Sequence, residues 1–449
     1  MNRSAPVKLA LVLSWITGAI FYLVPFHAFL TVWLSSFVGH YTLLRLWKEF
    51  LLVPIALGSI YLLAKGRLLR KKIFTLRLTQ LILVYSALLL AVGFIGLAKH
   101  SVTAKAMWYG LLVDLRFLVF FLAVLVIASS SGWLIANRRK LLFIPAILVA
   151  AFAIIQYLIL PYDFLKHFGY SDSTISPYET INHNLSHIRV MSTLRGANPL
   201  GAYLIVPLSV LAVSFFRRKT GRRDKLMLGF GLVLALAFSF SRSAWLGATL
   251  AVSLAAWFSF KSFKTRKIIG WWLAGVLAVG CVLVLTLRSN LTFENAIFHT
   301  DRQSTIATSS NQGHSAALKG AVKDITHQPL GGGVGSAGPQ SFYNHKPARI
   351  AENYFLQIGQ EAGLLGMALF IAICLALAKI LYENRDDNFA LAMLASLAGL
   401  TLVNLLSHAW ADDTLAYVWW GLAGIALAPI LTDRAKAKKW PKNQKTVNS

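Results

Sequence analysis

The sequence predicts an all-α integral membrane protein with about twelve transmembrane helices. Hydrophobic residues make up 57% of its 449 residues and charged residues only 14%, and the mean hydropathy of +0.61 is far above that of soluble globular proteins. Apolar runs of about twenty residues recur along the whole chain, and each is long enough to cross ~30 Å of hydrocarbon as a helix.

The predicted spans are residues 10–36, 49–64, 79–97, 107–128, 141–160, 198–216, 226–241, 244–260, 268–287, 353–381, 389–408 and 414–431. Pro25 interrupts the first of them. Two longer connections, 161–198 and 288–350, form the only sizeable predicted segments outside the membrane. We therefore expect one membrane domain over residues 1–432, followed by a basic tail at 433–449.

The distribution of basic residues predicts the orientation. Alternate connections, both termini included, contain 29 of the 44 Lys and Arg residues. Because positive charge is retained on the cytoplasmic side, both termini should be cytoplasmic and both long loops should lie outside. The net charge of +27 is then a topology signal, with the basic tail on anionic lipid headgroups, and no nucleic-acid partner is expected. Cys281 and Cys374 fall inside spans, which favours buried free thiols over a disulfide.

The second long loop contains a predicted amphipathic helix that ends at Pro329. Its apolar face repeats at helical spacing, with Ala317, Leu318, Ala321, Val322 and Ile325. Lys319 and Lys323 lie on the other face. We expect this helix to lie along the outer membrane interface, with its lysines towards headgroup phosphates.

Glu352 precedes the tenth span, where the N-terminus of a helix stabilises a carboxylate. A simple helix cap is the alternative explanation. A polar stripe nevertheless continues into the first turns of the span, with Asn353, Gln357, Gln360 and Glu361. Polar groups at that depth are costly and usually face a cavity or a partner, and for Glu361 we expect a neighbouring span. Gly359 and Gly363 are expected to allow close helix packing.

Three arginines are predicted at the outer membrane surface. Arg242 lies on a tight turn between the seventh and eighth spans, in FSFSRSAWLG, and Arg189 and Arg195 lie just before the sixth span. Each could reach lipid phosphates by snorkelling. Alternatively, the planar guanidinium could bind a substrate phosphate.

The other polar features of the sequence are weaker candidates for a functional site. The turn PLGGGVGSAGP could offer amides to an anion, but it lacks the lysine and hydroxyl of a P-loop. The histidines of the long loops lack the spacing of metal ligands, so no metal is predicted; they are His183, His187, His314, His327 and His345. Asp114 and Arg116, two positions apart within a span, point to different faces, and each needs its own structural partner.

Four segments in fixed order resemble the O-antigen ligase and polymerase family of bacterial membrane proteins. They are TLRGANPLGAYL before the sixth span, SFSRSAWLG, HQPLGGGVGSAG and ENYFLQIGQEAGLLG. The resemblance covers roughly residues 190–370. It implies a GT-C-like membrane glycosyltransferase in the bacterial cytoplasmic membrane, with its active site facing outside.

The resemblance also implies a reaction. The donor would be a glycan linked to polyprenyl diphosphate, and the acceptor a hydroxyl of a glycan, a lipid or the wall, with no nucleotide sugar, cofactor or metal. Arg242 matches the family arginine that contacts the diphosphate. This chain has His314 where the family has a second arginine, and Glu352 where it has a catalytic histidine.

A carboxylate can accept a hydroxyl proton as an imidazole can, so we predict Glu352 as the general base. A protonated His314, with Arg242, would stabilise the departing diphosphate. Further residues are predicted to bind the diphosphate or to support the site; these are Arg189, Arg195, Lys319, Asn353, Tyr354, Gln357 and His345. A relative that binds the lipid carrier without transferring glycan, and a small-solute transporter, are the alternatives. Polar groups gathered at the outer edge weigh against a transporter, whose site should lie near the membrane midplane.

Overall fold

A computed structural model describes residues 5–181, 184–218, 220–260 and 310–432, together with scattered residues between 262 and 286. Most of the predicted ninth span falls outside the described residues. His183, Cys281, the first part of the second loop and the basic tail also lie outside them. In the described part the chain is almost entirely helical, with one two-stranded sheet.

The elements follow the predicted spans closely. The long helices are α1 (Ala5–Leu23), α2 (His27–Val38), α4 (Trp47–Lys65), α6 (Arg77–Ala98), α7 (Ala104–Ser131), α8 (Trp133–Leu158), α9 (Ala197–Arg217), α10 (Arg222–Phe238), α11 (Arg242–Ser259), α14 (Ser310–His327), α15 (Tyr354–Glu383), α16 (Asn388–Leu406) and α17 (Asp413–Leu431). The short elements are η1 (Val24–Phe26), α3 (Tyr41–Leu44), α5 (Arg67–Thr75), η2 (Phe164–Phe168), β1 (Glu179–Ile181), β2 (Asn184–Arg189), η4 (Pro339–Tyr343) and η5 (Ala409–Ala411).

Nine helical segments of the described residues are long and apolar enough to cross a membrane, and they match nine of the predicted spans. The chain is therefore an all-α integral membrane protein, as predicted. Helices α10 and α11 form at the predicted seventh and eighth spans but are not among these nine. Pro25 lies in η1, which joins α1 to α2 within the first span.

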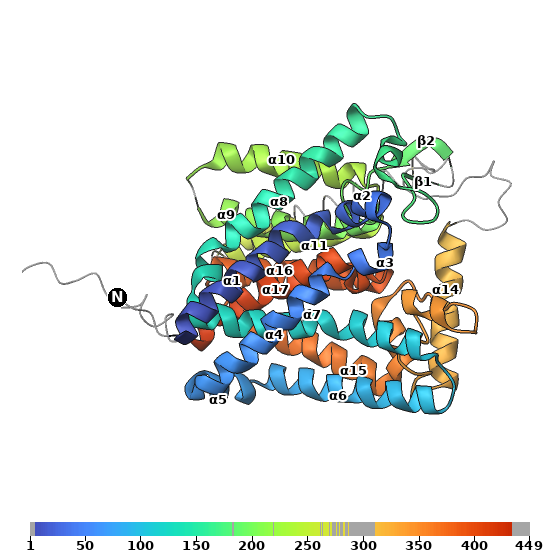
Figure 1. Ribbon diagram of the computed structural model, residues 1–449. Helices are drawn as coiled ribbons and strands as arrows, with labels where there is room; N and C mark the ends of the chain where they lie inside the picture. Colours follow the sequence, from blue (N-terminus) through green and yellow to red (C-terminus); the bar gives the residue numbers. More distant parts are fainter. Residues whose placement is uncertain are drawn as a thin grey trace, which may run out of the picture.

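The long helices run side by side, and α14 lies across one end of the bundle (Figure 1). The β1–β2 hairpin lies at the same end, which we call the site end, whereas α5 lies at the opposite end (Figure 1). Lys72 on α5 donates to the carbonyl of Leu431 at 2.8 Å and fixes the last turn of α17 there. The two loops predicted on one side of the membrane thus contribute to one end of the structure.

Glycines bring α9, α11 and α16 into close contact. A Cβ on Gly247 of α11 would lie 2.7 Å from the carbonyl oxygen of Gly399 on α16. A Cβ on Gly201 of α9 would lie 2.6 Å from the Cβ of Ala244. Small residues allow such backbone approach between membrane helices. These contacts hold the site-end residues of the three helices next to one another.

Helix α15 is interrupted at Gly363, whose φ of +69° is left-handed. The glycine-rich loop before α15 fills the break. The amides of Gly332 and Gly333 donate to the carbonyls of Gln360 and Glu361 at 2.8 and 3.0 Å, and the Leu364 amide donates to the Pro329 carbonyl at 2.9 Å. Gly363 therefore serves to dock a loop, and the prediction that it packs against another helix is wrong.

The polar stripe of α15 binds the same loop. Glu361 Oε1 accepts hydrogen bonds from the Gly335 amide and from Gln340 Nε2, each at 2.8 Å. The Glu361 carboxyl group also lies close to Asp114 of α7, the predicted neighbouring span. Gln360 Nε2 donates to Asp324 of α14 at 2.7 Å. The glycine-rich turn thus offers an amide to an anion, as predicted, but that anion is the protein's own carboxylate.

Arg116 belongs to a buried charged cluster that the sequence did not reveal. It contacts Asp413 and lies 3.0 Å from Glu49. The ammonium of Lys48 lies 2.9 Å from Asp413 and 3.1 Å from Glu49, and His27 lies 3.1 Å from Asp413. Two cations thus meet two anions beside an imidazole, which is the pairing that buried charges require. The cluster joins α2, α4, α7 and α17.

Candidate functional site

A cavity of about 360 Å³ opens at the site end, where the α10–α11 turn, β2, α14 and the start of α15 meet. Its lining residues are Arg189, Asn198, Phe240, Arg242, Ser243, Leu246, His314, Leu318, Glu352 and Leu406. Four residues predicted from the sequence, Arg189, Arg242, His314 and Glu352, therefore come together from separate segments. We call this space the polar cavity.

Glu352 lies just before α15 with a left-handed φ of +50°. Asn353, and not Glu352, caps the helix, because its side chain accepts from the Leu356 amide at 3.0 Å. Asn353 Nδ2 also donates to the Leu405 carbonyl of α16 at 3.0 Å. The cap and the hydrogen bond from Asn353 to Leu405 together fix the position of Glu352. The capping alternative for Glu352 is therefore wrong, and its carboxylate lines the cavity.

Backbone strain is concentrated at this cavity. Only five non-glycine residues of the described chain have a positive φ, and two of them, Phe240 and Glu352, line the polar cavity. A left-handed non-glycine residue costs of order 1 kcal/mol or more and persists where the surrounding structure over-determines it. Such positions gather at functional sites, so the strain supports this cavity as the candidate site.

His314 and Glu352 are in contact through Nδ1 and Oε2. Oε2 has almost no exposed surface, although the Glu352 side chain as a whole is 34% exposed. The exposed surface of Glu352 therefore belongs to its other side-chain atoms. Burial lowers the pKa of the His314 imidazole, and the positive charge of Arg242 lowers it further. The contact thus pairs an imidazole with a carboxylate inside the polar cavity.

Arg242 is the first residue of α11 and follows a three-residue turn after α10. Trp245 holds this turn, because its indole Nε1 donates to the Leu236 carbonyl at 2.9 Å. The close packing of α11 against α9 and α16 fixes the axis of the helix. Arg242 therefore presents its charge to the cavity from a rigid position beside His314.

Arg189 also lines the cavity, but protein groups engage all three of its guanidinium nitrogens. Nε donates to the Ser239 carbonyl at 3.2 Å and one terminal nitrogen donates to Asn198 Oδ1 at 2.6 Å. The other lies 3.5 Å from Glu179. Arg189 thus ties the hairpin to the turn that carries Arg242, which is a positioning role.

Arg195 lines a neighbouring cavity of about 260 Å³ and not the polar cavity. Asn198 lines both spaces, so they adjoin. Glu179, His408 and Asp412 also line the second cavity, and sequence reasoning did not single them out. Burial lowers the pKa of His408 to about 4, and the charge of Arg195 acts in the same direction. The signal that could have identified this group is the run SHAWADD between the last two spans.

An apolar groove of about 620 Å³ runs between α15 and α16. At one end it is lined by Asn353 and Leu405, which are the chain neighbours of Glu352 and Leu406 in the polar cavity. Leu375 and Ala378 line it more than five turns further along α15. The groove therefore leads from the polar cavity along the membrane-spanning part of α15.

Other predicted site residues lie elsewhere. The Tyr354 hydroxyl is buried and donates to Asp114 at 3.2 Å, and Gln357 is buried against Gly338. Lys319 and His345 are exposed and line none of these cavities. Of the predicted supporting residues, only Asn353 lies at the site. It caps α15 next to Glu352, and it lines the apolar groove.

Comparison with protein families identifies a part of the chain that contains the centre of this site. Residues 226–371 match the family described as O-Antigen ligase. The match includes Arg242, His314 and Glu352, together with the glycine-rich loop and the broken start of α15. No curated protein matches the chain. Over residues 226–371, about a third of its length, the chain is thus similar to the O-antigen ligase family.

Proposed function

We propose that this protein transfers a glycan from a polyprenyl-diphosphate donor to a hydroxyl of a saccharide or another cell-surface acceptor, outside the cytoplasmic membrane. The observation that carries the proposal is the meeting of Arg242, His314 and Glu352 in one cavity at the site end. The family supplies the reaction class, and these three residues supply chemistry suited to it.

In the proposed step, Glu352 Oε1 accepts the proton of the acceptor hydroxyl. The acceptor oxygen forms a bond to the anomeric carbon of the donor sugar while the bond from that carbon to the diphosphate oxygen breaks. The electron pair of this bond leaves with the polyprenyl diphosphate. Negative charge grows on the leaving diphosphate, and Arg242 stabilises it. Attack opposite the leaving group inverts the anomeric carbon.

His314 has a different role here from the one predicted from the sequence. The contact between His314 Nδ1 and Glu352 Oε2 holds one side of the carboxylate and leaves Oε1 for the acceptor. A hydrogen bond from a third group commonly orients a catalytic base. We therefore assign His314 as the residue that positions Glu352, while Arg242 interacts with the diphosphate.

The groove between α15 and α16 fits the lipid part of the donor. Its lining is apolar apart from Asn353 and Thr401, and it extends from the polar cavity along a membrane helix. An isoprenoid chain in this groove would place its diphosphate near Arg242 and Glu352. The cavity and the groove together thus suit a phosphate-bearing lipid better than a small soluble solute.

The test is glycan transfer by the purified protein in detergent from a polyprenyl-diphosphate glycan. Glu352→Gln should lower kcat by roughly 10²–10⁴, the usual contribution of a general base, with little change in donor affinity. His314→Gln should cost less, because the carboxylate remains. The opposite order would make the imidazole the base, and near-normal turnover in Glu352→Gln would remove Glu352 from the reaction.

The same preparation separates the alternatives. Donor binding without transfer under all acceptor conditions would indicate a relative that only binds the carrier. Solute flux in proteoliposomes, with no lipid-linked glycan consumed, would indicate a transporter. Ligase and polymerase differ in the acceptor, so product analysis with a lipid acceptor and with a lengthening glycan distinguishes them.

A further inference from the structure

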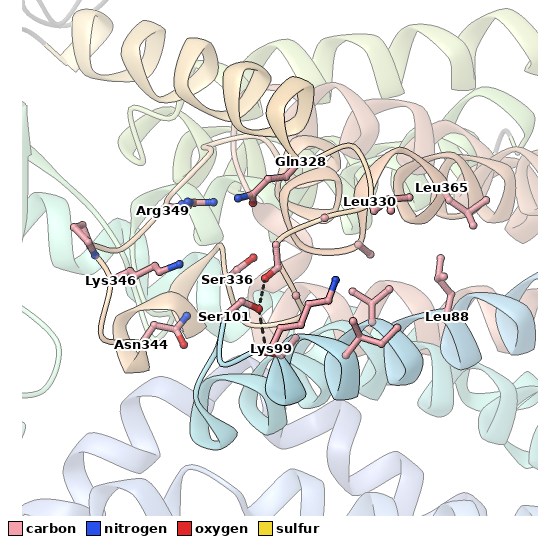
Figure 2. A pocket seen from close by; sticks show the side chains of 18 residues that line it. Leu88, Lys99, Ser101, Gln328, Leu330, Ser336, Asn344, Lys346, Arg349 and Leu365 are labelled. Atoms are coloured by element: carbon pink, nitrogen blue, oxygen red, sulfur yellow. Dashed lines mark hydrogen bonds between the residues drawn. The ribbon is translucent and has the colours of Figure 1, made fainter.

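A third cavity, of about 490 Å³, lies at the other end of α14, between the glycine-rich loop, α6 and α15. None of the residues assigned to glycan transfer lines it. Eighteen residues line it, and Figure 2 shows an uneven distribution of their side chains. Lys346 and Arg349 lie at one end, Lys99 lies between, and Leu88, Leu330 and Leu365 lie at the other end (Figure 2).

The polar end of this pocket carries positive charge. Lys99, Lys346 and Arg349 are its charged lining residues, and no acidic side chain belongs to the lining. Arg349 lies 3.6 Å from Asp324 of α14, which is one neighbouring acid. Among the described residues, no hydrogen bond or ion pair engages the ammonium group of Lys99 or Lys346. Two unpaired cations beside a partly paired arginine form a site for an anion.

Neutral donors accompany these cations. Gln328, Ser336 and Asn344 line the same end (Figure 2). The loop is held rigidly, because the Ser101 hydroxyl donates to the Gly332 carbonyl at 2.9 Å and Asn344 Nδ2 donates to the Gly335 carbonyl at 2.7 Å. A rigid loop keeps the donors in place before a ligand arrives, which reduces the entropy cost of binding.

The apolar end is a wall of membrane helix. Leu88, Val92 and Ile95 line the pocket from within α6, and Lys99 caps the same helix. At 1.5 Å per residue, the wall from Leu88 to Lys99 is about 16 Å long. Leu330 is 85% exposed and Leu365 is 59% exposed. An inorganic phosphate would make no use of these surfaces, whereas a hydrocarbon chain would cover them.

We propose that this pocket binds a phosphate-bearing lipid, with the phosphate among Lys99, Lys346 and Arg349 and the hydrocarbon chain along α6 and Leu365. The site is distinct from the polar cavity and does not depend on the proposed glycan transfer. Arg349 lies three residues before Glu352 and pairs with α14, so the bound lipid would contact the segment that leads to the polar cavity.

Lipid binding to the full-length protein in detergent, measured by native mass spectrometry, tests the proposal. The probes are phosphatidylglycerol, phosphatidylcholine with the same chains, and inorganic phosphate. Wild-type protein should bind phosphatidylglycerol most tightly. The double variant Lys99→Gln/Lys346→Gln should lose about thirtyfold in affinity, which corresponds to about 1 kcal/mol for each cation near a lipid phosphate. Binding of phosphatidylcholine should change by less than twofold.

The matched control is Lys166→Gln/Lys323→Gln, which removes two exposed lysines outside the pocket. It should bind phosphatidylglycerol as the wild type does. Equal loss in both double variants would mean general charge attraction and would overturn the site. The pair Leu330→Gln/Leu365→Gln tests the lipid source, because it should weaken phosphatidylglycerol binding severalfold. Phosphate binding that depends on the lysines, with no effect of the leucine changes, would identify a free anion and overturn the lipid assignment.

Discussion

The carboxylate of Glu361 binds the backbone amide of Gly335 at 2.8 Å, although the two residues lie 26 positions apart. This bond ties the glycine-rich loop to the second turn of α15. The same loop lines the cavity that contains Lys99, Lys346 and Arg349, and its continuation leads to Glu352. Glu361 thus acts on the site through the loop, without touching the polar cavity.

Glu361→Ala should lower stability by roughly 2 kcal/mol or more, because it leaves the Gly335 amide and Gln340 without their acceptor. Glu361→Gln should remain close to the wild type, since its amide keeps an oxygen for both donors and can donate to Asp114. Thermal unfolding in detergent measures the difference. Equal melting temperatures for the two variants would show that this carboxylate does not anchor the loop.

Arg242→Gln should weaken binding of polyprenyl diphosphate by roughly 10- to 100-fold, as expected for the loss of charge-assisted hydrogen bonds. Direct binding of the lipid diphosphate without its glycan measures this, so the result does not depend on turnover. Arg189→Gln is the comparison, because its guanidinium is engaged by Ser239, Asn198 and Glu179. It should reduce thermal stability more than donor affinity. Unchanged donor affinity in Arg242→Gln would exclude the diphosphate contact.

Asp413→Asn should destabilise the protein by about 3–5 kcal/mol, because it leaves Arg116 and Lys48 buried with one anion between them. Glu383→Gln is a suitable control. Glu383 forms an exposed pair with Lys379, and such pairs contribute at most about 1 kcal/mol. Both variants can be compared by thermal unfolding. Similar melting temperatures would mean that the cluster contributes little to stability.

Stability should fall as the pH is lowered below about 6.5, in part because of His408. Its pKa is about 4 in the folded protein against 6.5 ordinarily, so the unfolded chain binds a proton that the folded chain excludes. The stabilisation is complete above pH 6.5 and is lost as the pH falls towards 4. It amounts to at most about 3 kcal/mol. His408→Gln should flatten the melting temperature between pH 7 and 4.5, and an unchanged slope would count against this residue.

Much of the fold follows from the sequence, because each span must satisfy its own backbone in lipid. The tight turn at Arg242, the loop helix and the break at Pro25 all formed where local sequence predicts them. Arg242, His314 and Glu352 also meet, since topology places their segments at one end. Such features can be predicted from local sequence patterns, without knowledge of tertiary contacts.

The remaining features depend on contacts that no local pattern contains. Lys48 and Asp413 each begin a helix and look like ordinary membrane-edge charges, yet they share one buried cluster with Arg116. Gly363 resembles a packing glycine, and only the loop that enters its helix explains its left-handed φ. The second cavity around His408 and Arg195 likewise combines two connections that are far apart in sequence.

The break in α15 also has a consequence for how the chain is made. Lipid offers no hydrogen bonds, so a helix interrupted at Gly363 cannot satisfy all of its backbone groups within the bilayer by itself. The groups that complete it, at Pro329, Gly332 and Gly333, precede the helix in the chain. These hydrogen-bonding groups are therefore synthesised before α15, and the backbone of α15 can form its remaining hydrogen bonds as soon as the helix is made.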